Sequence, residues 1–379
     1  MKFTDTPNKR RWTDLVEINL SVPGTPPRTS RIVIASGLAA ELRLELASLS
    51  QGRRVYWLWD AKVWELWKRR VSCLNWPELT PDRLILFDAS EANKRLAAVE
   101  VLARRLLRAG ADRLSLVVAV GGGVTGDVVG FLASIYMRGI PHVHLPTTLL
   151  AQVDSSVGGK TGVDLPEGKN LLGSFQQALA VFIDPEFLET LPVEQFSQGM
   201  AEVIKMAMLG DEPLWRYLEG NHAQIWKREQ QAMVHIIASS CRLKAQIVEA
   251  DEKESGRRRF LNLGHTVGHA LERLSEYQIQ HGDAVAMGML AATRLAERLG
   301  MVSADVFQRL VGLHRMYGLP SKLVSGFSPD SLIEAFKTDK KQLAGKLHFI
   351  LPTGIGSVVE RHDLDLALLR EVLGGLQSG

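Results

Sequence analysis

Short β-branched runs alternate with helical patterns along the first half of the chain. The apolar runs predict five strands, at residues 31–35, 54–59, 83–87, 114–120 and 142–145. Apolar spacing between these runs predicts helices at residues 38–49 and 91–109. Strands that alternate with helices indicate a parallel sheet that is covered on both faces. The pattern therefore predicts an α/β domain, which we place at residues 1–184.

Beyond about Asp184 the pattern changes to longer helical periods. The apolar spacing predicts four helices, at residues 191–218, 232–252, 261–275 and 283–299. A break at Gly318 and Pro320 precedes a further helical stretch, and residues 347–351 predict one late strand. We therefore expect a mainly α-helical C-terminal domain over residues 185–379.

Length and composition are those of a globular protein with two domains. The chain has 379 residues, of which 46% are hydrophobic and 23% are charged, so it is too apolar for disorder and too long for one ordinary core. Its 45 basic and 42 acidic residues leave a net charge of only +3, which argues against a nucleic-acid partner. The two cysteines, Cys73 and Cys241, are too few for a disulfide framework.

The sequence gives no sign of a membrane partner or of export. No run reaches the roughly 18 uncharged apolar residues of a membrane span. The first residues lack the apolar core of a signal peptide. We therefore expect a cytoplasmic protein.

The segment Gly121–Gly126 fits the pattern G-x-G-x-x-G and follows a predicted strand. Such a turn lets the backbone approach a pyrophosphate, and the predicted helix at residues 127–134 would offer unpaired N–H groups. A plain strand-to-helix turn explains the same residues equally well. No acid ends the next strand, but Asp60 ends an upstream one. A dinucleotide could still bind across the sheet, with Asp60 near a ribose, in a topology that differs from the usual one.

A polar, glycine-rich stretch at residues 152–162 follows the predicted sheet. It contains Asp154 and Lys160, and Lys169 and Asn170 come soon after it. Lysine charges and glycine-rich backbone are the groups that proteins use to bind phosphate. Solvated loop lysines are the alternative.

Glu202, His265 and His281 are candidate ligands of a metal ion. Glu202 lies in an apolar helical stretch and would share a helix face with Lys205, as His265 would with His269. Two histidines and a carboxylate leave an open coordination position, which is typical of a catalytic zinc site. Any one of these residues is more simply explained as a capping or core residue, but the three together favour a site.

Further cations lie in the second half of the chain. Lys244, Arg258 and the tract Asp339-Lys340-Lys341 are candidates for binding an anion. A solvated surface is the alternative, and it is the interpretation that we favour for Arg257 and Arg259.

These motifs, taken as a set, resemble one family. The segments GGGVTGD, PTTLLAQVDSSVGGKTG, GKN, AEVIK, LNLGHTVGHA and HGDAVA look like those of the 3-dehydroquinate synthases, within the wider group of sugar phosphate cyclases. The similarity runs from about residue 31 to residue 360, and the segment at residues 152–162 is highly specific. The departures are the start of the chain up to about Trp12, Asp283, and residues 176–178, and none of them carries a predicted role.

The resemblance implies a fold and a reaction. The fold would be an α/β N-terminal domain with a Rossmann-like parallel sheet that binds NAD, plus a mainly α-helical C-terminal domain that binds metal. The cofactors would be NAD and one divalent metal, Zn²⁺ or Co²⁺. The substrate would be a phosphorylated keto acid, 3-deoxy-D-arabino-heptulosonate 7-phosphate. The implied route is oxidation of an alcohol, loss of phosphate, reduction and aldol closure to 3-dehydroquinate, in the shikimate pathway of aromatic amino acid biosynthesis.

The resemblance also implies roles for individual residues. The metal ligands would be Glu202, His265 and His281. The NAD positions would be Asp60, Glu91, Lys94, Gly122, Gly123, Val124, Thr125, Gly126, Asp127, Thr147, Thr148, Lys160, Lys169, Phe187 and Thr190. The phosphate end of the substrate would meet Lys160, Asn170, Asn262, His269 and Lys340 or Lys341. Its carboxylate end would meet Lys244 and Arg258, and other active-site positions would be Asp154, Lys169 and Lys205. Arg138 would reach the site of a neighbouring subunit, which implies a homodimer.

Three rival interpretations remain open. Another sugar phosphate cyclase, of the inosose or valiolone synthase type, would act on a substrate without a carboxylate, whereas Arg258 and Asn262 suit an anionic one. A metal-dependent polyol dehydrogenase of related fold would release NADH. A regulatory protein that only binds a nucleotide would leave the polar cluster without a role.

Overall fold

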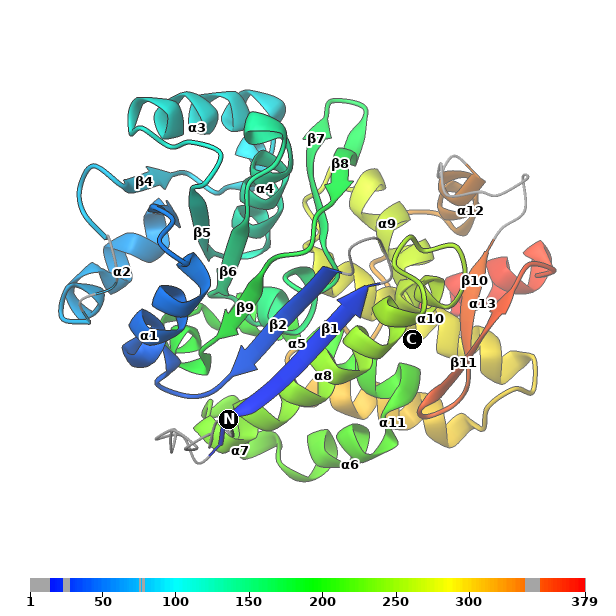
Figure 1. Cartoon of the computed structure of the whole chain (residues 1–379). Coiled ribbons are helices and arrows are strands. Elements are labelled where there is room, and N and C mark those ends of the chain that lie inside the picture. Colours follow the sequence, from blue (N-terminus) through cyan, green and yellow to red (C-terminus); the bar gives the residue numbers. More distant parts are fainter. Residues whose placement is uncertain (1–13, 23–27, 75, 77–78, 338–347, 379) are drawn as a thin grey trace.

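The computed structural model describes residues 14–22, 28–74, 76, 79–337 and 348–378. Figure 1 shows a sheet with its helices in the N-terminal half and a cluster of helices in the C-terminal half. The tract Asp339-Lys340-Lys341 lies outside the described residues.

A seven-stranded sheet organises the N-terminal half. Its strands, in spatial order, are β1 (Val16–Val22), β2 (Arg28–Ile34), β9 (Ala180–Ile183), β6 (His142–Pro146), β5 (Leu116–Gly121), β3 (Val55–Asp60) and β4 (Leu84–Phe87). Only β1 is antiparallel to its neighbour; the other adjacent pairs are parallel. The predicted parallel sheet is confirmed, but the sequence analysis missed the edge strand β1 and the central strand β9.

Helices cover both faces of this sheet. On one face, α1 (Leu38–Ser50) and α2 (Ala61–Ser72) pack against Trp57 and Trp59. On the other face, α3 (Leu96–Arg108) and α4 (Gly123–Ile135) pack against Tyr56 and Leu58. Burial on both faces explains why the strand sequences are nearly continuous apolar runs rather than alternating ones.

The strand order reverses between β3 and β5. From β3 the chain moves outward to β4, and from β5 it moves the other way to β6, so the connecting helices lie on opposite faces. The carboxyl ends of β3, β5 and β6 lie side by side, since Trp59 pairs with Val120 and Gly121 with Pro146. Ligands of open α/β sheets bind in the crevice at such a reversal.

The polar stretch after the sheet folds into a hairpin that was not predicted. Residues Ala151–Ser155 form one π-helical turn, and β7 (Lys160–Leu165) pairs with β8 (Gly168–Phe175). The expected loops therefore lie partly in strands. A Cβ at Gly162 would come within 2.7 Å of the Leu172 carbonyl oxygen, so this close strand pairing needs glycine. Because glycine has no side chain, it interrupts the alternation of apolar and polar residues by which a strand is predicted.

Three helix predictions were wrong in their extent. The one at residues 261–275 begins only at His265, after a 3₁₀ turn that ends at Asn262. The predicted helix at residues 91–109 is a 3₁₀ turn, η1 (Glu91–Asn93), followed by α3. The chain is extended at Arg95, because Lys94 turns inward to meet Asp127. The predicted helix at residues 191–218 is two helices, and it divides at Asp211, whose carboxylate caps the second by accepting from the Leu214 amide.

The C-terminal half is mainly helical, as predicted. Its longer helices are α5 (Val193–Gly210), α6 (Glu212–Gly220), α8 (Gln230–Ala250), α9 (His265–Leu274), α10 (His281–Arg298), α11 (Ala304–Met316), α12 (Pro329–Lys337) and α13 (Leu366–Ser378). Its shorter elements are α7 (His222–Trp226), the 3₁₀ turns η4 (Pro185–Thr190) and η5 (Arg257–Asn262), and the hairpin of β10 (Phe349–Gly354) and β11 (Ser357–Arg361). A further 3₁₀ turn, η2 (Tyr136–Arg138), follows α4 in the N-terminal half. None of the described helices is long and apolar enough to cross a membrane.

One hydrophobic core joins the two halves. It contains Ile32 and Ile34 of β2 and Ile183 of β9 together with apolar residues of α5, α8, α10 and α11. The outer strands β1 and β2 therefore lie over α8. The domain division at residue 184 stays a prediction, because the core is continuous across it.

Candidate active site

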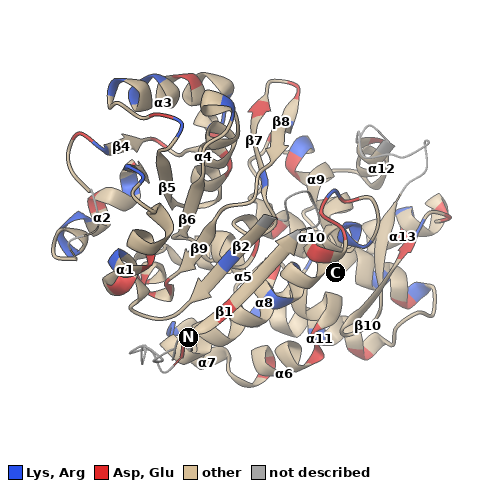
Figure 2. Cartoon of the chain, in the orientation of Figure 1, with Lys and Arg blue, Asp and Glu red and all other residues tan. Residues whose placement is uncertain are grey.

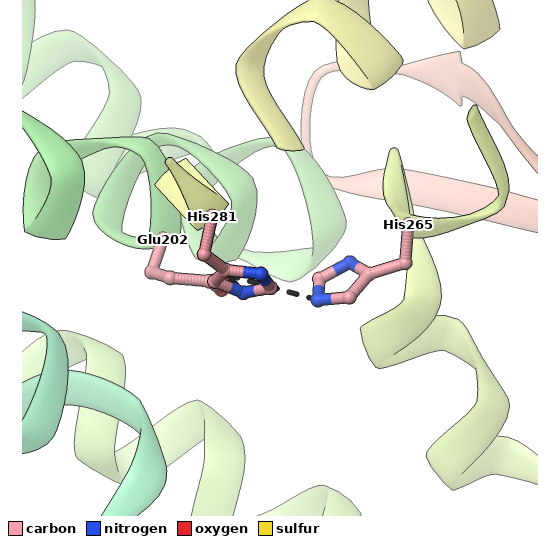
Figure 3. Close-up of side chains that lie close together, drawn as sticks. All are labelled: Glu202, His265 and His281. Carbon is pink, nitrogen blue, oxygen red and sulfur yellow. Dashed lines mark ion pairs between the residues drawn. The ribbon is translucent and has the colours of Figure 1, made fainter. Parts of the chain in front are cut away.

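Glu202, His265 and His281 point toward one another from three helices (Figure 3). Glu202 is completely buried in α5, and each histidine is the first residue of its helix, α9 or α10. The Nε2 atoms of His281 and His265 lie 3.5 and 3.7 Å from Glu202 Oε1. One potential ligand atom from each residue lies within 4.8 Å of the others. The structure thus brings together the three residues that were predicted as metal ligands.

Glycines make this convergence possible, because they let three helices approach backbone to backbone. A Cβ at Gly288 of α10 would lie 1.8 Å from the Gly264 carbonyl oxygen, and one at Gly268 of α9 would lie 3.0 Å from that of Ala284. A Cβ at Gly282 would lie 2.4 Å from the Gln198 carbonyl oxygen of α5. Gly264, at φ 80°, also supplies the left-handed turn before α9. The glycines beside the histidines therefore set the position of the site.

Hydrogen bonds orient both imidazole rings. His265 Nδ1 lies 3.1 Å from the Leu263 carbonyl oxygen, and His281 Nδ1 lies 3.5 Å from Glu272 Oε2. An Nδ1 that is held by an acceptor leaves the Nε2 lone pair for a metal. Glu202 Oε1 is buried and has no hydrogen-bond partner among the described residues. A buried oxygen without a partner, facing two imidazole nitrogens, fits a cation.

Electrostatics make this pocket attractive to a cation. Burial opposes ionisation of Glu202, but Lys205 and His281 outweigh it and lower its pKa to about 2. Burial also opposes protonation of His281, but Glu202 and Glu272 raise its pKa to about 9. The predicted pairing of Glu202 with Lys205, three residues further along α5, is confirmed. A metal would therefore meet ionised carboxylates and would displace a proton from His281.

A buried pair of opposite charges lies beside this pocket. Lys244 Nζ of α8 donates to both the carbonyl oxygen and Oδ1 of Asp154, each at 2.7 Å. Burial opposes ionisation of Asp154, but Lys244 and Lys205 outweigh it and lower its pKa. Burial lowers the pKa of Lys244. The pair gives the site a lysine that releases its proton more readily than usual.

Arg258, Lys160 and Asn262 gather around the start of β7. Arg258 is buried and its Nη2 donates to the Gly158 carbonyl oxygen at 2.9 Å, while its Nε has no partner among the described residues. Asn262 Nδ2 donates to Glu254 Oε1 at 2.6 Å, and Lys160 pairs with the other oxygen of Glu254. The structure therefore brings these three predicted residues together.

Lys169 links the hairpin to both halves of the molecule. Its Nζ lies 3.0 Å from Glu91 Oε1 of η1 and 3.4 Å from Glu272 Oε1 of α9. Nearby, the buried Lys94 contacts Asp127 at 2.6 Å and Asn170 Oδ1 at 2.6 Å. The contacts of Lys169 thus connect the predicted dinucleotide end with Glu272, which contacts His281 at the predicted metal end. The contacts of Lys94 tie the hairpin to α4.

Several of the residues predicted to hold a dinucleotide lie at the carboxyl ends of β3, β5 and β6. Asp60 caps α2 by accepting from the Lys62 amide at 2.8 Å. Gly122 caps α4, and a Cβ there would come within 3.0 Å of Thr148 Cγ2. The Thr147 amide donates to the Gly121 carbonyl oxygen at 2.9 Å, which fixes the two turns together. These residues therefore lie together at the reversal of strand order, where ligands of open α/β sheets bind.

Other predicted residues lie on neighbouring elements or outside the described part of the chain. Val124, Thr125 and Gly126 lie in the first turn of α4. Phe187 packs on Trp67, and Thr190 Oγ1 accepts from Trp67 Nε1 at 2.9 Å. His269 lies one turn beyond His265, with ring centroids 5.3 Å apart. Arg138 is exposed on η2, and its predicted contact with a second subunit stays a prediction. Lys340 and Lys341 lie outside the described residues.

Two acidic residues of the site were missed in the sequence. Glu272 lies seven residues after His265 on α9, and Glu254 precedes η5 in a loop. The spacing of His265, His269 and Glu272 places all three on one helix face, which was a usable signal. Nothing local marks Glu254, because its partners Lys160 and Asn262 come from distant segments.

Comparisons with known proteins agree with this arrangement. Family models for 3-dehydroquinate synthase match the chain in two parts, the N-terminal part at residues 84–198 and the C-terminal part at residues 199–342. The chain is similar to a curated 3-dehydroquinate synthase from Nitrobacter winogradskyi, at 43% identity over 91% of this chain and 93% of the relative.

Solved structures of related enzymes share the fold. A 2-epi-5-epi-valiolone synthase from Streptomyces hygroscopicus, solved with NAD⁺ and Zn²⁺, matches with a TM-score of 0.84 at 29% identity, over 92% of this chain and 96% of that one. A 2-deoxy-scyllo-inosose synthase, solved with carbaglucose-6-phosphate, NAD⁺ and Co²⁺, matches with a TM-score of 0.80 at 26% identity, over 94% and 99%. Fold and site together define an enzyme of the sugar phosphate cyclase class. Within that class, the chain belongs to the 3-dehydroquinate synthase family.

Proposed function

We propose that the chain converts 3-deoxy-D-arabino-heptulosonate 7-phosphate into 3-dehydroquinate and phosphate. The observation that carries the proposal is the convergence of Glu202, His265 and His281 beside a cluster of buried cations, in a chain of this family. The reaction comprises transient oxidation of a secondary alcohol, elimination of phosphate, reduction and intramolecular aldol closure. It would place the protein in the shikimate pathway.

Glu202, His265 and His281 would hold one divalent metal, Zn²⁺ or Co²⁺. The Oε1 atom of Glu202, which accepts no hydrogen bond among the described residues, and the orientation of both Nε2 atoms support this assignment. When bound, the metal supplies a Lewis acid that polarises a hydroxyl or carbonyl oxygen of the substrate. Glu272 holds His281 in the required orientation, and Lys205 balances the charge of Glu202.

The crevice at the carboxyl ends of β3 and β5 would hold NAD. Asp60 lies where a ribose hydroxyl would be recognised, and Gly122 and Gly123 leave the backbone of α4 open to a pyrophosphate. When bound, NAD supplies the hydride acceptor for the alcohol and the hydride donor for the later reduction. Lys94 and Asp127, paired at 2.6 Å, would fix the wall between this crevice and the hairpin.

The chain's own charged residues would bind and orient the substrate. Lys244 and Arg258, both buried, suit a carboxylate, while Lys160 and Asn262 suit a phosphate. Binding at both ends would fix which alcohol faces the hydride acceptor, which is an orientation effect. Lys244, with its lowered pKa, is placed to hold or release a proton next to Asp154.

Phosphate release from the heptulosonate phosphate tests the proposal. The metal-loaded chain with NAD should release phosphate with no net gain of NADH, and removal of metal by a chelator should abolish the release. Glu202→Gln should lose activity and the metal bound at this site, whereas His222→Gln, at an exposed position of α7, should lose neither.

Each rival function predicts a different outcome of the same assay. Phosphate release from sedoheptulose 7-phosphate or glucose 6-phosphate instead would indicate another cyclase. Net accumulation of NADH would indicate a dehydrogenase. Release that survives thorough removal of metal would contradict the assignment of Glu202, His265 and His281.

A further inference from the structure

A second cluster of metal-type ligands lies on the β10–β11 hairpin, outside the site described above. His348 precedes β10, Glu360 lies in β11, and His362 follows β11. One potential ligand atom from each of these residues lies within 4.8 Å of the others. None of the three belongs to the proposed catalytic or cofactor-binding residues.

The strand register explains why these three side chains meet. Phe349 pairs with Arg361 and Ile350 with Glu360, so the next opposed pair along the ladder is His348 and His362. Directly opposed residues of antiparallel strands project to one face, and so do residues two apart along a strand. Glu360 therefore lies on the same face as both histidines.

The observed contacts agree with this register. His348 Nδ1 lies 2.9 Å from Glu360 Oε1, and the two imidazole rings lie 4.2 Å apart between centroids, inclined at 72°. The side chains of His348 and Glu360 are 21% and 19% exposed, so the cluster is partly shielded but open to solvent. Burial opposes ionisation of Glu360, but His348 and Arg259 outweigh it and lower its pKa.

We propose that His348, Glu360 and His362 form a second binding site for a transition-metal cation of the Zn²⁺ class. Two imidazoles and one carboxylate are the donors that Zn²⁺, Co²⁺, Ni²⁺ and Cu²⁺ prefer, whereas Ca²⁺ and Mg²⁺ require oxygen ligands. Tetrahedral coordination by such donors needs ligand atoms roughly 3.3 Å apart, and small side-chain rotations would bring these atoms to that spacing. A water molecule would complete the coordination.

The bound cation would cross-link β10 and β11 at the open end of the hairpin. The His348 carbonyl oxygen accepts from Thr266 Oγ1 of α9 at 3.1 Å, so this end of β10 is tied to the residue after His265. Arg259 limits the affinity, because its Nη1 lies 3.4 Å from Glu360 Oε1 and competes for the carboxylate. The inference does not rest on the proposed reaction.

Counting bound Zn²⁺ tests the second site. The full chain without an added histidine tag is stripped with a chelator and then dialysed against a fixed micromolar concentration of free Zn²⁺. We expect about two equivalents per chain in the unmodified protein. His348→Gln combined with His362→Gln should bind about one and should keep its phosphate-releasing activity, and Glu202→Gln should also bind about one. His222→Gln is the matched control and should bind about two.

The competing arginine provides a test in the opposite direction. Arg259→Gln removes the cation next to Glu360, so the second equivalent should bind up to about fivefold more tightly. If the double variant does not fold, His362→Gln alone should also bind about one equivalent. This single variant should fold, because the His362 side chain is exposed.

Two results would overturn the inference. One is an unmodified chain that binds a single equivalent and loses it in Glu202→Gln, which would make the cluster an ion pair with a packed imidazole. The other is a double histidine variant that still binds two. Failure of the proposed reaction would leave these metal counts unchanged, so the two proposals fail separately.

Discussion

At the scale of single residues, the site depends on partners that hold the candidate ligands in place. Glu272 contacts His281 Nδ1 on one side and Lys169 on the other. Burial opposes its ionisation, but His281 and Lys169 lower its pKa to about 2, so it carries a full charge at neutral pH. Glu272 would thus act on a metal bound at the proposed site through His281 rather than by direct contact.

Glu272→Gln should therefore weaken metal binding without removing a ligand. The amide keeps the shape of the side chain but loses the charge that orients and polarises His281, and changes of this kind cost about 10–100-fold in metal affinity. Competition with a chromophoric chelator measures the effect directly. Glu276→Gln, in the exposed turn after α9, should leave the affinity unchanged. Equal affinity in both variants would remove Glu272 from the site.

Residues of the site could be predicted where the sequence carries a local pattern. His265 and His281 each lie beside a glycine in the sequence, and Glu202 lies in a run of residues with helical periodicity. These local patterns were enough to single out the three residues. Glu254 could not be predicted, because its partners Lys160 and Asn262 meet it only in the folded chain. The cluster of His348, Glu360 and His362 was missed for the same reason, since it depends on the register of a hairpin.

At the scale of elements, the close packing of α9 on α10 positions both histidines. A Cβ at Gly288 would lie 1.8 Å from the Gly264 carbonyl oxygen, a distance that no side chain rotation relieves. The two helices must separate to admit any larger residue. The histidines at their N-termini would then move away from Glu202.

Gly288→Ala should destabilise the chain and weaken metal binding together. Overpacking of this kind costs roughly 1–3 kcal/mol in the free energy of unfolding. Gly312→Ala in α11 is the matched control, because a Cβ there meets nothing within 4 Å; it should stabilise by about 0.4–1 kcal/mol. Urea unfolding and metal affinity are measured for both variants. If the Gly288→Ala chain is as stable as the unmodified one, then α9 and α10 can move apart to admit a methyl group at little cost in free energy.

The sequence predicted the type of most elements but not where some of them end. Strands β3 and β5 were predicted within one or two residues, because their apolar runs are buried on both faces. The helix predicted at residues 91–109 was too long. Lys94 turns inward to form an ion pair with Asp127, which is remote in sequence, and a helix cannot continue through that turn. The hairpin of β7 and β8 was missed because glycines and lysines interrupt its alternation.

At the scale of the whole molecule, the sheet is not independent of the helices. Apolar residues of β1, β2 and β9 share one core with α5, α8 and α10. Figure 2 shows that charged residues are scattered over the elements with both signs interspersed. The face of β2 that carries Ile32 and Ile34 would be exposed to water if the helical half were absent.

A fragment of residues 1–184 should therefore fail to fold alone. It would expose the apolar side chains of β2 and β9 that α5 and α8 cover, and exposed apolar surface of this kind drives aggregation. Coexpression with residues 185–379 should restore a soluble complex, because the two pieces together rebuild the shared core. Size-exclusion chromatography and thermal unfolding report the outcome. If the fragment is monomeric and unfolds cooperatively by itself, the sheet with α1 to α4 is sufficient for folding. The shared core would then only hold together two halves that fold independently.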